Sequence, residues 1–190
     1  MKSALLMLSI AIGSRIEAQS LDIRGVEFTL GGVADSALAR LSSRFQVRKD
    51  TSCSECRGGR YRLFAMSRGA GGNEGSIIVA NNRIHSITKY YADSLIGRTG
   101  YGDIRIVYTA GMKELHSRGG DSCSTRNLTV RDLNQPNVLE DWPTGIRFEV
   151  GSDAIAGIET DCGKYRLLLQ LPHQRSQFAF LWLELTNDPP

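Results

Sequence analysis

Residues 76–88 read Ser-Ile-Ile-Val-Ala-Asn-Asn-Arg-Ile-His-Ser-Ile-Thr, and this stretch decides the fold class. Two runs rich in β-branched residues flank the short polar segment Asn81-Asn82-Arg83. β-Branched side chains favour strands, and Asn tolerates the positive φ angles of tight turns. The pattern therefore predicts a β-hairpin, and with it an antiparallel sheet.

Upstream of this hairpin, the sequence predicts a strand, a helix and a further strand. Residues 21–30 alternate apolar and polar side chains, and the alternation changes phase at Gly25, which predicts a half-buried strand with a bulge there. A helix is expected over residues 34–44, and residues 61–66 form a strand candidate. The helix is indicated by an acidic residue in its first turn and by apolar residues at i, i+4, i+7 and i+11: Asp35, Ala34, Leu38, Leu41 and Phe45.

The second half repeats the order of helix and strands. A helix is predicted to start near Ile104 and to stop at Gly119-Gly120, although residues 103–106 also alternate like a strand. Its apolar or small positions follow helical spacing: Ile104, Val107, Tyr108, Gly111 and Leu115. Strand candidates follow at 124–130, 146–150, 165–171 and 177–185.

The last strand candidate carries two different apolar faces. Aromatic residues alternate with small and aliphatic ones, which are Phe178, Phe180 and Trp182 against Ala179, Leu181, Leu183 and Leu185. A strand that is apolar on both faces is expected to be central or well covered. Glu184 ends the aromatic face with a charge, so that face is expected to meet solvent there.

These elements predict an α+β fold of two tandem modules, each a helix packed on an antiparallel β-sheet. We assign residues 1–18 to a signal peptide, 19–92 to the first module and 93–190 to the second. The boundary between the modules is placed within residues 92–102.

The N-terminus has the pattern of a secretory signal. Lys2 precedes an apolar run of about ten residues, which matches the first two regions of a signal peptide and is too short to span a bilayer. Cleavage is expected after Ala18, with an earlier alternative at Ala11-Ile12-Gly13. The sequence therefore predicts a secreted or periplasmic protein without a membrane span.

The charge distribution argues against a nucleic-acid partner. The chain has 23 Lys and Arg against 20 Asp and Glu, a net charge of +3. The basic residues are scattered among acidic ones, whereas a nucleic-acid-binding protein gathers them into a stripe.

The four cysteines predict disulfides, because an even number in an exported chain is the mark of an oxidised framework. We favour Cys53 with Cys56, which a tight turn can close, and Cys123 with Cys162. The pairing 53–123 with 56–162 stays open.

The sequence predicts no catalytic, cofactor or metal site. A thioredoxin-like Cys53–Cys56 pair would start a helix, but Arg57-Gly58-Gly59 follows it. Zinc sites use close ligand pairs, whereas Cys123 and Cys162 are far apart in sequence. The remaining catalytic candidates stand alone in the sequence: His85, His116 and His173. Aromatic residues expected near turns are instead candidates for an interface: Tyr90, Tyr91, Tyr101 and Trp142.

Two segments resemble known proteins. Residues 25–32, followed by a helix and a hairpin, resemble the repeat of the SmpA/OmlA-type outer-membrane proteins and of the β-lactamase inhibitor protein. The resemblance implies a helical part packed on an antiparallel sheet that binds other proteins. Gly31-Gly32 replaces the usual Gly-Met, and the lipid-bearing Cys of the outer-membrane proteins is missing. Residues 162–166, after Cys123, resemble uncharacterised exported bacterial proteins, which implies a disulfide role for these cysteines.

Together these observations predict an exported, non-catalytic protein that binds another exported or envelope protein, as an inhibitor-like module would. Two alternatives stay open. One is a thiol-disulfide enzyme that uses Cys53 and Cys56, and the other is a purely structural envelope protein.

Overall fold

The computed structural model describes residues 19–41, 43–51, 59–66, 72–92, 101–133, 138–141, 146–171 and 180–187, and the fold is α+β. The proposed signal peptide, Cys53, Cys56, Trp142 and His173 lie outside these residues. None of the described helices is long and apolar enough to cross a membrane.

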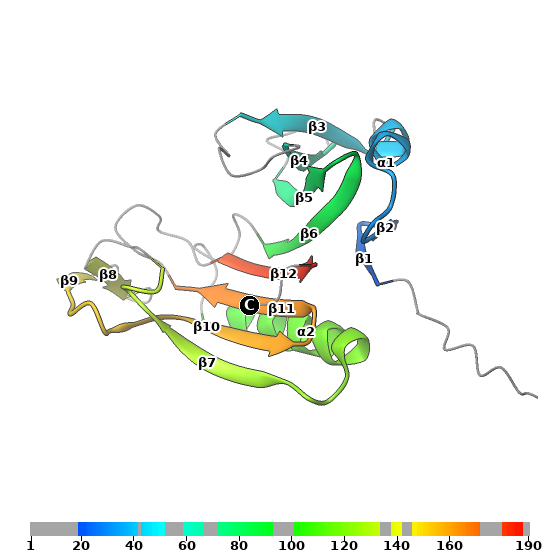
Figure 1. Ribbon diagram of the computed structural model, residues 1–190. Coiled ribbons are helices and arrows are strands. Elements are labelled where there is room, and N and C mark those ends of the chain that lie inside the picture. Colours follow the sequence, from blue (N-terminus) through cyan, green and yellow to red (C-terminus); the bar gives the residue numbers. More distant parts are fainter. Residues whose placement is uncertain are drawn as a thin grey trace, which may run out of the picture.

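One antiparallel sheet of eight strands dominates the structure, in the order β3-β4-β5-β6-β12-β11-β10-β7 (Figure 1). Its strands are β3 (Phe45–Asp50), β4 (Arg60–Ala65), β5 (Asn73–Ala80), β6 (Arg83–Ala92), β7 (Ser124–Thr129), β10 (Ile155–Cys162), β11 (Tyr165–Gln170) and β12 (Phe180–Thr186). The first half of the chain contributes the neighbouring strands β3, β4, β5 and β6, the second half contributes β12, β11, β10 and β7, and the two halves meet at the β6–β12 pair.

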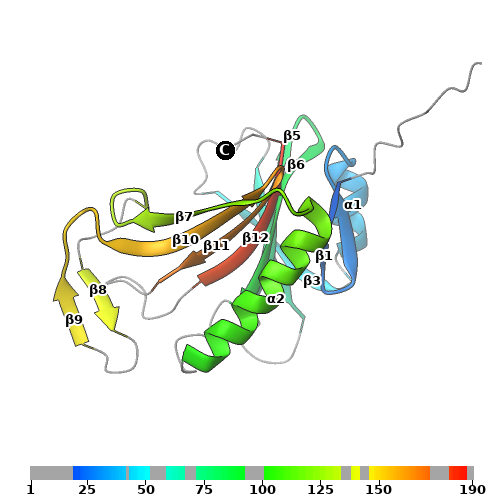
Figure 2. The same ribbon diagram turned by 90° about the horizontal axis from the view of Figure 1, so that it is seen from below.

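Two helices and two small hairpins complete the described structure. Helix α1 (Ala34–Leu41) and the hairpin β1 (Ser20–Ile23) with β2 (Val26–Thr29) belong to the first half. Helix α2 (Tyr101–Gly119) and the hairpin β8 (Val138–Asp141) with β9 (Ile146–Glu149) belong to the second. Figure 2 shows α2 on one face of the large sheet, next to β12.

The hairpin predicted from residues 76–88 is confirmed. Strands β5 and β6 pair from Ala80↔Arg83 onward, and Asn81 and Asn82 form the turn with φ angles of 51° and 56°. Asn adopts this left-handed conformation more readily than most residues. Both strands are longer than predicted, since β5 begins at Asn73 and β6 runs from Arg83 to Ala92.

The first segment differs from its prediction at two places. Gly25 is not a bulge, because Arg24 and Gly25 form the tight turn of the β1–β2 hairpin with φ angles of 49° and 77°. Helix α1 ends at Leu41 rather than at residue 44. Phe45 continues the helical spacing by coincidence, since it begins β3 and is buried there.

In the second half the helix is confirmed, and the competing strand at 103–106 is wrong. Gly120 follows α2 with a φ of 77°, as expected of a helix stop. Strands β7, β9, β11 and β12 correspond to the four predicted strands, and β12 is central, as its two apolar faces indicate. Strands β3, β8 and β10 were not predicted from the sequence.

One face of the large sheet carries the hydrophobic core. Helix α2 packs on it, and a Cβ added to Gly111 would lie 3.0 Å from Leu167 of β11. The β1–β2 hairpin packs on the same face. Gly75 of β5 lies opposite Lys89, whose side chain contacts α2, and a Cβ added to Gly75 would lie 2.7 Å from Ile23 of β1. Gly75 therefore allows a close approach of hairpin and sheet. The core includes Leu21, Phe28, Leu63, Ile77, Ile87, Leu115, Leu181, Leu183 and Leu185.

A partly buried ionic cluster fastens α2 to β6. Lys89 donates to Glu114 at 2.7 Å, Tyr91 also donates to Glu114, and Arg118 lies 3.3 Å from the same carboxylate. Burial acts to raise the pKa of Glu114, but the hydrogen bonds from Lys89 and Tyr91 and the nearby cations outweigh it, and the pKa is lowered. The folded state therefore favours the carboxylate.

We predict that Glu114→Gln lowers the free energy of unfolding at neutral pH by about 1–3 kcal/mol, since Lys89 loses its counter-charge. Folding lowers the pKa of Glu114. Its contribution to the free energy of unfolding is therefore complete at pH values above its ordinary pKa of 4.5, and is lost as the pH falls through its pKa in the folded state. The difference between wild type and variant should shrink on acidification. Urea unfolding from neutral to acidic pH measures it, with the exposed Glu149→Gln as the control.

Candidate functional site

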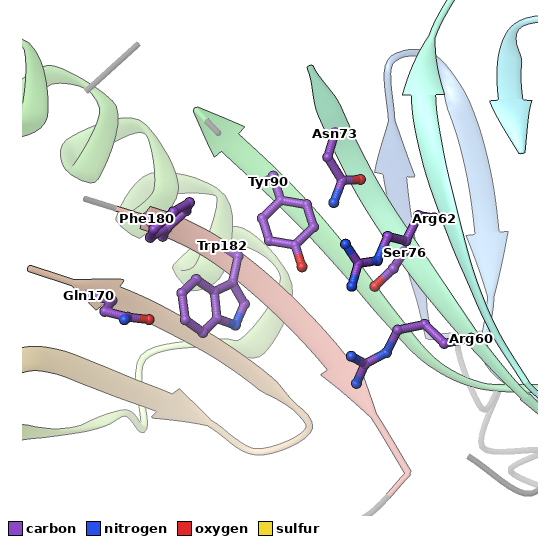
Figure 3. Close-up of a pocket in the computed structure, with 8 residues that line it drawn as sticks. All are labelled: Arg60, Arg62, Asn73, Ser76, Tyr90, Gln170, Phe180 and Trp182. Carbon is purple, nitrogen blue, oxygen red and sulfur yellow. The ribbon is translucent and has the colours of Figure 1, made fainter. Parts of the chain in front are cut away.

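A cavity of about 340 Å³ lies on the face of the sheet opposite α2. It spans strands β4, β5, β6, β12 and β11, so both halves of the chain contribute to it. Its lining is Arg60, Arg62, Asn73, Ser76, Tyr90, Gln170, Phe180 and Trp182, and Figure 3 shows how these side chains are grouped. The volume lies at the lower end of the range for ligand pockets, about 300–1,000 Å³.

Strand register brings the lining residues together. Arg62 lies opposite Ser76 on β4 and β5, and Tyr90 lies opposite Trp182 on β6 and β12. Gln170 of β11 lies opposite Phe180 of β12. Since alternate residues of a strand point to opposite faces, these pairs share the face that the core does not use.

Two arginines give the cavity a positive wall, but their partners differ. The Nε and Nη2 atoms of Arg62 donate to one carboxylate oxygen of Asp50, at 3.0 and 2.7 Å. The Nε of Arg60 is buried, and no hydrogen-bond partner for it occurs in the described part of the chain. A buried donor without an acceptor is costly, so Arg60 is poised for an anionic ligand group.

The other wall is aromatic. The rings of Tyr90 and Trp182 lie 6.4 Å apart between centroids, tilted by 54°, and Phe180 follows along β12. Burial raises the pKa of Tyr90, although Arg60, Ser76 and Arg62 act to lower it. The Tyr90 hydroxyl therefore stays protonated at neutral pH and can donate a hydrogen bond. The cavity can hold an acidic group against Arg60 with an apolar group beside it.

A larger hollow of about 660 Å³ lies between β2 and α1. Its charged side chains, Glu27, Arg40 and Arg44, are all exposed. Charges that remain hydrated gain little from a ligand, so the hollow is a weaker candidate site.

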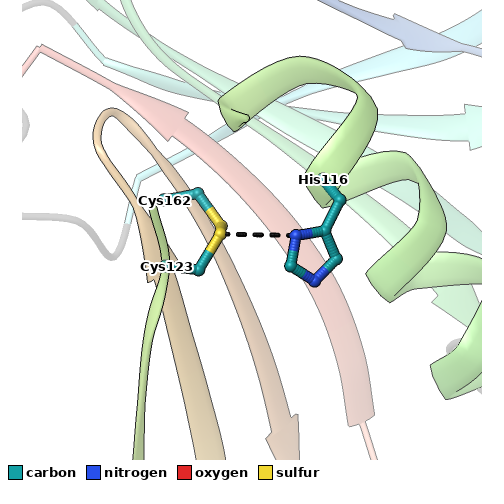
Figure 4. A group of neighbouring side chains, drawn as sticks. All are labelled: His116, Cys123 and Cys162. Atoms are coloured by element: carbon teal, nitrogen blue, oxygen red, sulfur yellow. Dashed lines mark hydrogen bonds between the residues drawn. A yellow bond between two sulfur atoms is a disulfide. The ribbon is translucent and has the colours of Figure 1, made fainter. Parts of the chain in front are cut away.

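The structure confirms the predicted disulfide between Cys123 and Cys162, which bridges 39 positions of sequence (Figure 4). It also corrects the view of His116 as an isolated residue. The Nδ1 atom of His116, in the last turn of α2, lies 3.5 Å from the sulfur of Cys123 and 3.4 Å from the carbonyl oxygen of Gly120. No hydrogen can come from the disulfide sulfur, so His116 is the donor to both atoms when its Nδ1 is protonated.

Of the four predicted interface aromatics, the structure describes Tyr90, Tyr91 and Tyr101. Tyr90 and Tyr91 lie near the end of β6 and point to opposite faces, since Tyr90 lines the cavity and Tyr91 contacts Glu114 of α2. Tyr101 is the first residue of α2. Cys53, Cys56 and Trp142 lie outside the described residues.

Sequence reasoning missed Arg60, Arg62 and Ser76. The signal was present in the Arg-Tyr-Arg order at 60–62, since alternation places both arginines on one face of a strand. That this face meets Trp182, more than a hundred residues later, depends on the pairing of β6 with β12.

Comparisons of the chain with protein-family models, with curated proteins and with solved structures gave no match.

The two cavity arginines should differ in their effect on stability. Arg60→Met removes a buried donor for which the described part of the chain offers no acceptor, so we expect no loss in the free energy of unfolding. Arg62→Met removes the two hydrogen bonds that Arg62 donates to Asp50, whose side chain is only 8% exposed, and should lower the free energy of unfolding by about 1 kcal/mol. Urea unfolding of both variants checks this. A larger loss for Arg60→Met would show that Arg60 has a structural role.

Proposed function

We propose that this protein is an exported, non-catalytic module that binds another exported or envelope protein through the open face of its eight-stranded sheet. The observation that carries the proposal is the buried Nε of Arg60, which has no hydrogen-bond partner among the described residues and lies beside Tyr90 and Trp182. A partner carboxylate would satisfy this donor, and the aromatic wall would cover an apolar side chain next to it.

The residue types of the cavity support a protein partner. Trp, Tyr and Arg are the residues that most often dominate the energy of protein interfaces. The lining adds neutral hydrogen-bonding groups, Asn73, Ser76 and Gln170, and no acid, histidine or cysteine is among its eight described residues. Such a lining suits recognition better than acid–base or nucleophilic chemistry.

The fold supports the same use. We propose that residues 19–92 and 93–190 act as two helix-on-sheet modules joined edge to edge by β6 and β12. This arrangement agrees with the resemblance of residues 25–32 and their surroundings to SmpA/OmlA-type proteins and the β-lactamase inhibitor protein. The alternative enzyme would use Cys53 and Cys56, which lie outside the described residues and so add no geometry in its favour.

A peptide selection tests the proposed binding face. Random peptides displayed on phage and selected on the wild-type protein should be enriched in Asp or Glu next to an aromatic or aliphatic residue. A charge-assisted hydrogen bond is worth about 1.5–3 kcal/mol, so Arg60→Gln should weaken a selected peptide roughly 10- to 100-fold, measured by calorimetry.

Two controls make the selection specific. Trp182→Ala should weaken the same peptide, whereas Arg131→Gln, an arginine with its side chain 70% exposed and far from the cavity in sequence, should not. Peptides that bind with equal affinity to all three variants would place the binding surface elsewhere and overturn the proposal.

Export is proposed from the N-terminal pattern. The disulfide between Cys123 and Cys162 agrees with an oxidising compartment. The full-length chain, expressed in a Gram-negative host, should be recovered from the periplasm or medium with Gln19 as its first residue. N-terminal sequencing checks the cut and separates it from the earlier one after Gly13. Recovery of the uncut chain from the cytoplasm alone would contradict export.

A further inference from the structure

His116, Cys123 and Cys162 come from three different elements and meet at one point. Their ligand atoms, one nitrogen and two sulfurs, all lie within 4.8 Å of one another. We propose that these residues form a binding site for a thiophilic divalent cation, such as Zn²⁺, once a thiol reductant has opened the Cys123–Cys162 disulfide.

The backbone holds the three residues together without the disulfide. Strands β7 and β10 pair from Ser124↔Asp161 onward, and the side chains of Thr125 and Thr160 are hydrogen-bonded at 3.0 Å. Continuing this register places Cys123 opposite Cys162. The two cysteines therefore remain neighbours after reduction.

The C-terminal end of helix α2 is held beside Cys162 by contacts that do not involve the disulfide. Arg118 donates to the carbonyl oxygen of Ser20 at 2.8 Å, and Tyr165 of β11 donates to the same oxygen at 3.1 Å. Gly119 lies directly against Cys162, where a Cβ would come 2.8 Å from the Cys162 carbonyl oxygen. His116, one turn earlier in α2, is therefore kept beside the sulfurs.

The ligand set matches the chemistry of zinc. Two thiolates and one imidazole leave a fourth tetrahedral position for water, and the two negative charges neutralise the cation. His116 is exposed and Cys123 is partly exposed, so an ion can enter from solvent, whereas Cys162 is only 1% exposed. The sulfurs must separate to bind one ion, and rotation of the side chains on Cα atoms 4.3 Å apart provides this movement.

The chemistry balances in two steps. Two molecules of a small thiol reduce the disulfide, giving two cysteine thiols and one disulfide of the reductant. The cation then displaces one proton from each thiol as the two metal–sulfur bonds form. A disulfide oxidant, such as the oxidised form of the same small thiol, takes up the two electrons when the Cys123–Cys162 bond re-forms, and the ion is released.

Cobalt binding tests the site, because tetrahedral Co²⁺ with thiolate ligands absorbs visible light strongly. The mature chain would carry Cys53→Ser and Cys56→Ser, which removes the other thiols, and would be reduced with a phosphine under anaerobic conditions. We expect one equivalent of Co²⁺ to bind to the reduced protein, to be displaced by Zn²⁺, and not to bind to the oxidised protein.

A matched pair of histidine variants assigns the third ligand. His116→Ala should lower the Co²⁺ affinity of the reduced protein roughly 100-fold, since even groups that only support metal ligands contribute about 10- to 100-fold. His85→Ala, in β6, should leave it unchanged. Equal affinity in the two variants, or no stoichiometric binding by the reduced protein, would overturn the proposal.

Circular dichroism follows the fold during the titration. If reduction lowers the order of the end of α2 and the start of β7, the spectrum should change. Cobalt should then restore the spectrum of the oxidised protein, since metal binding would replace the lost crosslink. A reduced chain that unfolds and is not restored by cobalt would also overturn the proposal.

Discussion

The pairing of β6 with β12 is the interaction on which the rest of the structure depends. It joins residues about a hundred positions apart, with cross-strand partners from Leu181↔Ala92 to Thr186↔Ser86. Without it, each half of the sheet would end in an exposed hydrophobic edge strand, which is prone to aggregation. Because β12 presents buried leucines on one face and Phe180 and Trp182 on the other, the same pairing fixes both the core and the open face.

The face of the sheet opposite α2, which is the open face, carries several buried polar side chains. Ser76, Ser86 and Thr88 are at most 9% exposed there. Ser86 donates to Glu184 at 3.0 Å, and Arg166 lies 3.2 Å from the same carboxylate, so this charge is already compensated. Arg60 differs, since its buried Nε has no such partner among the described residues. Among the described residues that line the cavity, Arg60 is therefore the cation whose buried donor a ligand could satisfy.

The sequence predicted the elements whose signals are local. Asn81-Asn82 marked the central hairpin, Gly119-Gly120 marked the end of α2, and the leucine–aromatic alternation marked β12 as central. Strand β10 was missed because Glu159 and Asp161 look like surface residues. Glu159 is in fact only 3% exposed, and Arg126 at 2.9 Å and Arg166 compensate its charge. Burial of a charge depends on partners from other strands, which a local pattern does not contain.

Both sites illustrate why the candidate chemistry was harder to predict than the fold. The cavity needs the register of five strands, so neither the Arg60–Arg62 spacing nor Trp182 alone indicates it. The disulfide was predicted from cysteine number, but His116 joins it only because α2 ends against Cys162 through the small Gly119. A larger residue at 119 would push the helix end away from the sulfurs. Backbone approach at one glycine, rather than the spacing of ligands in the sequence, therefore brings imidazole and sulfur together.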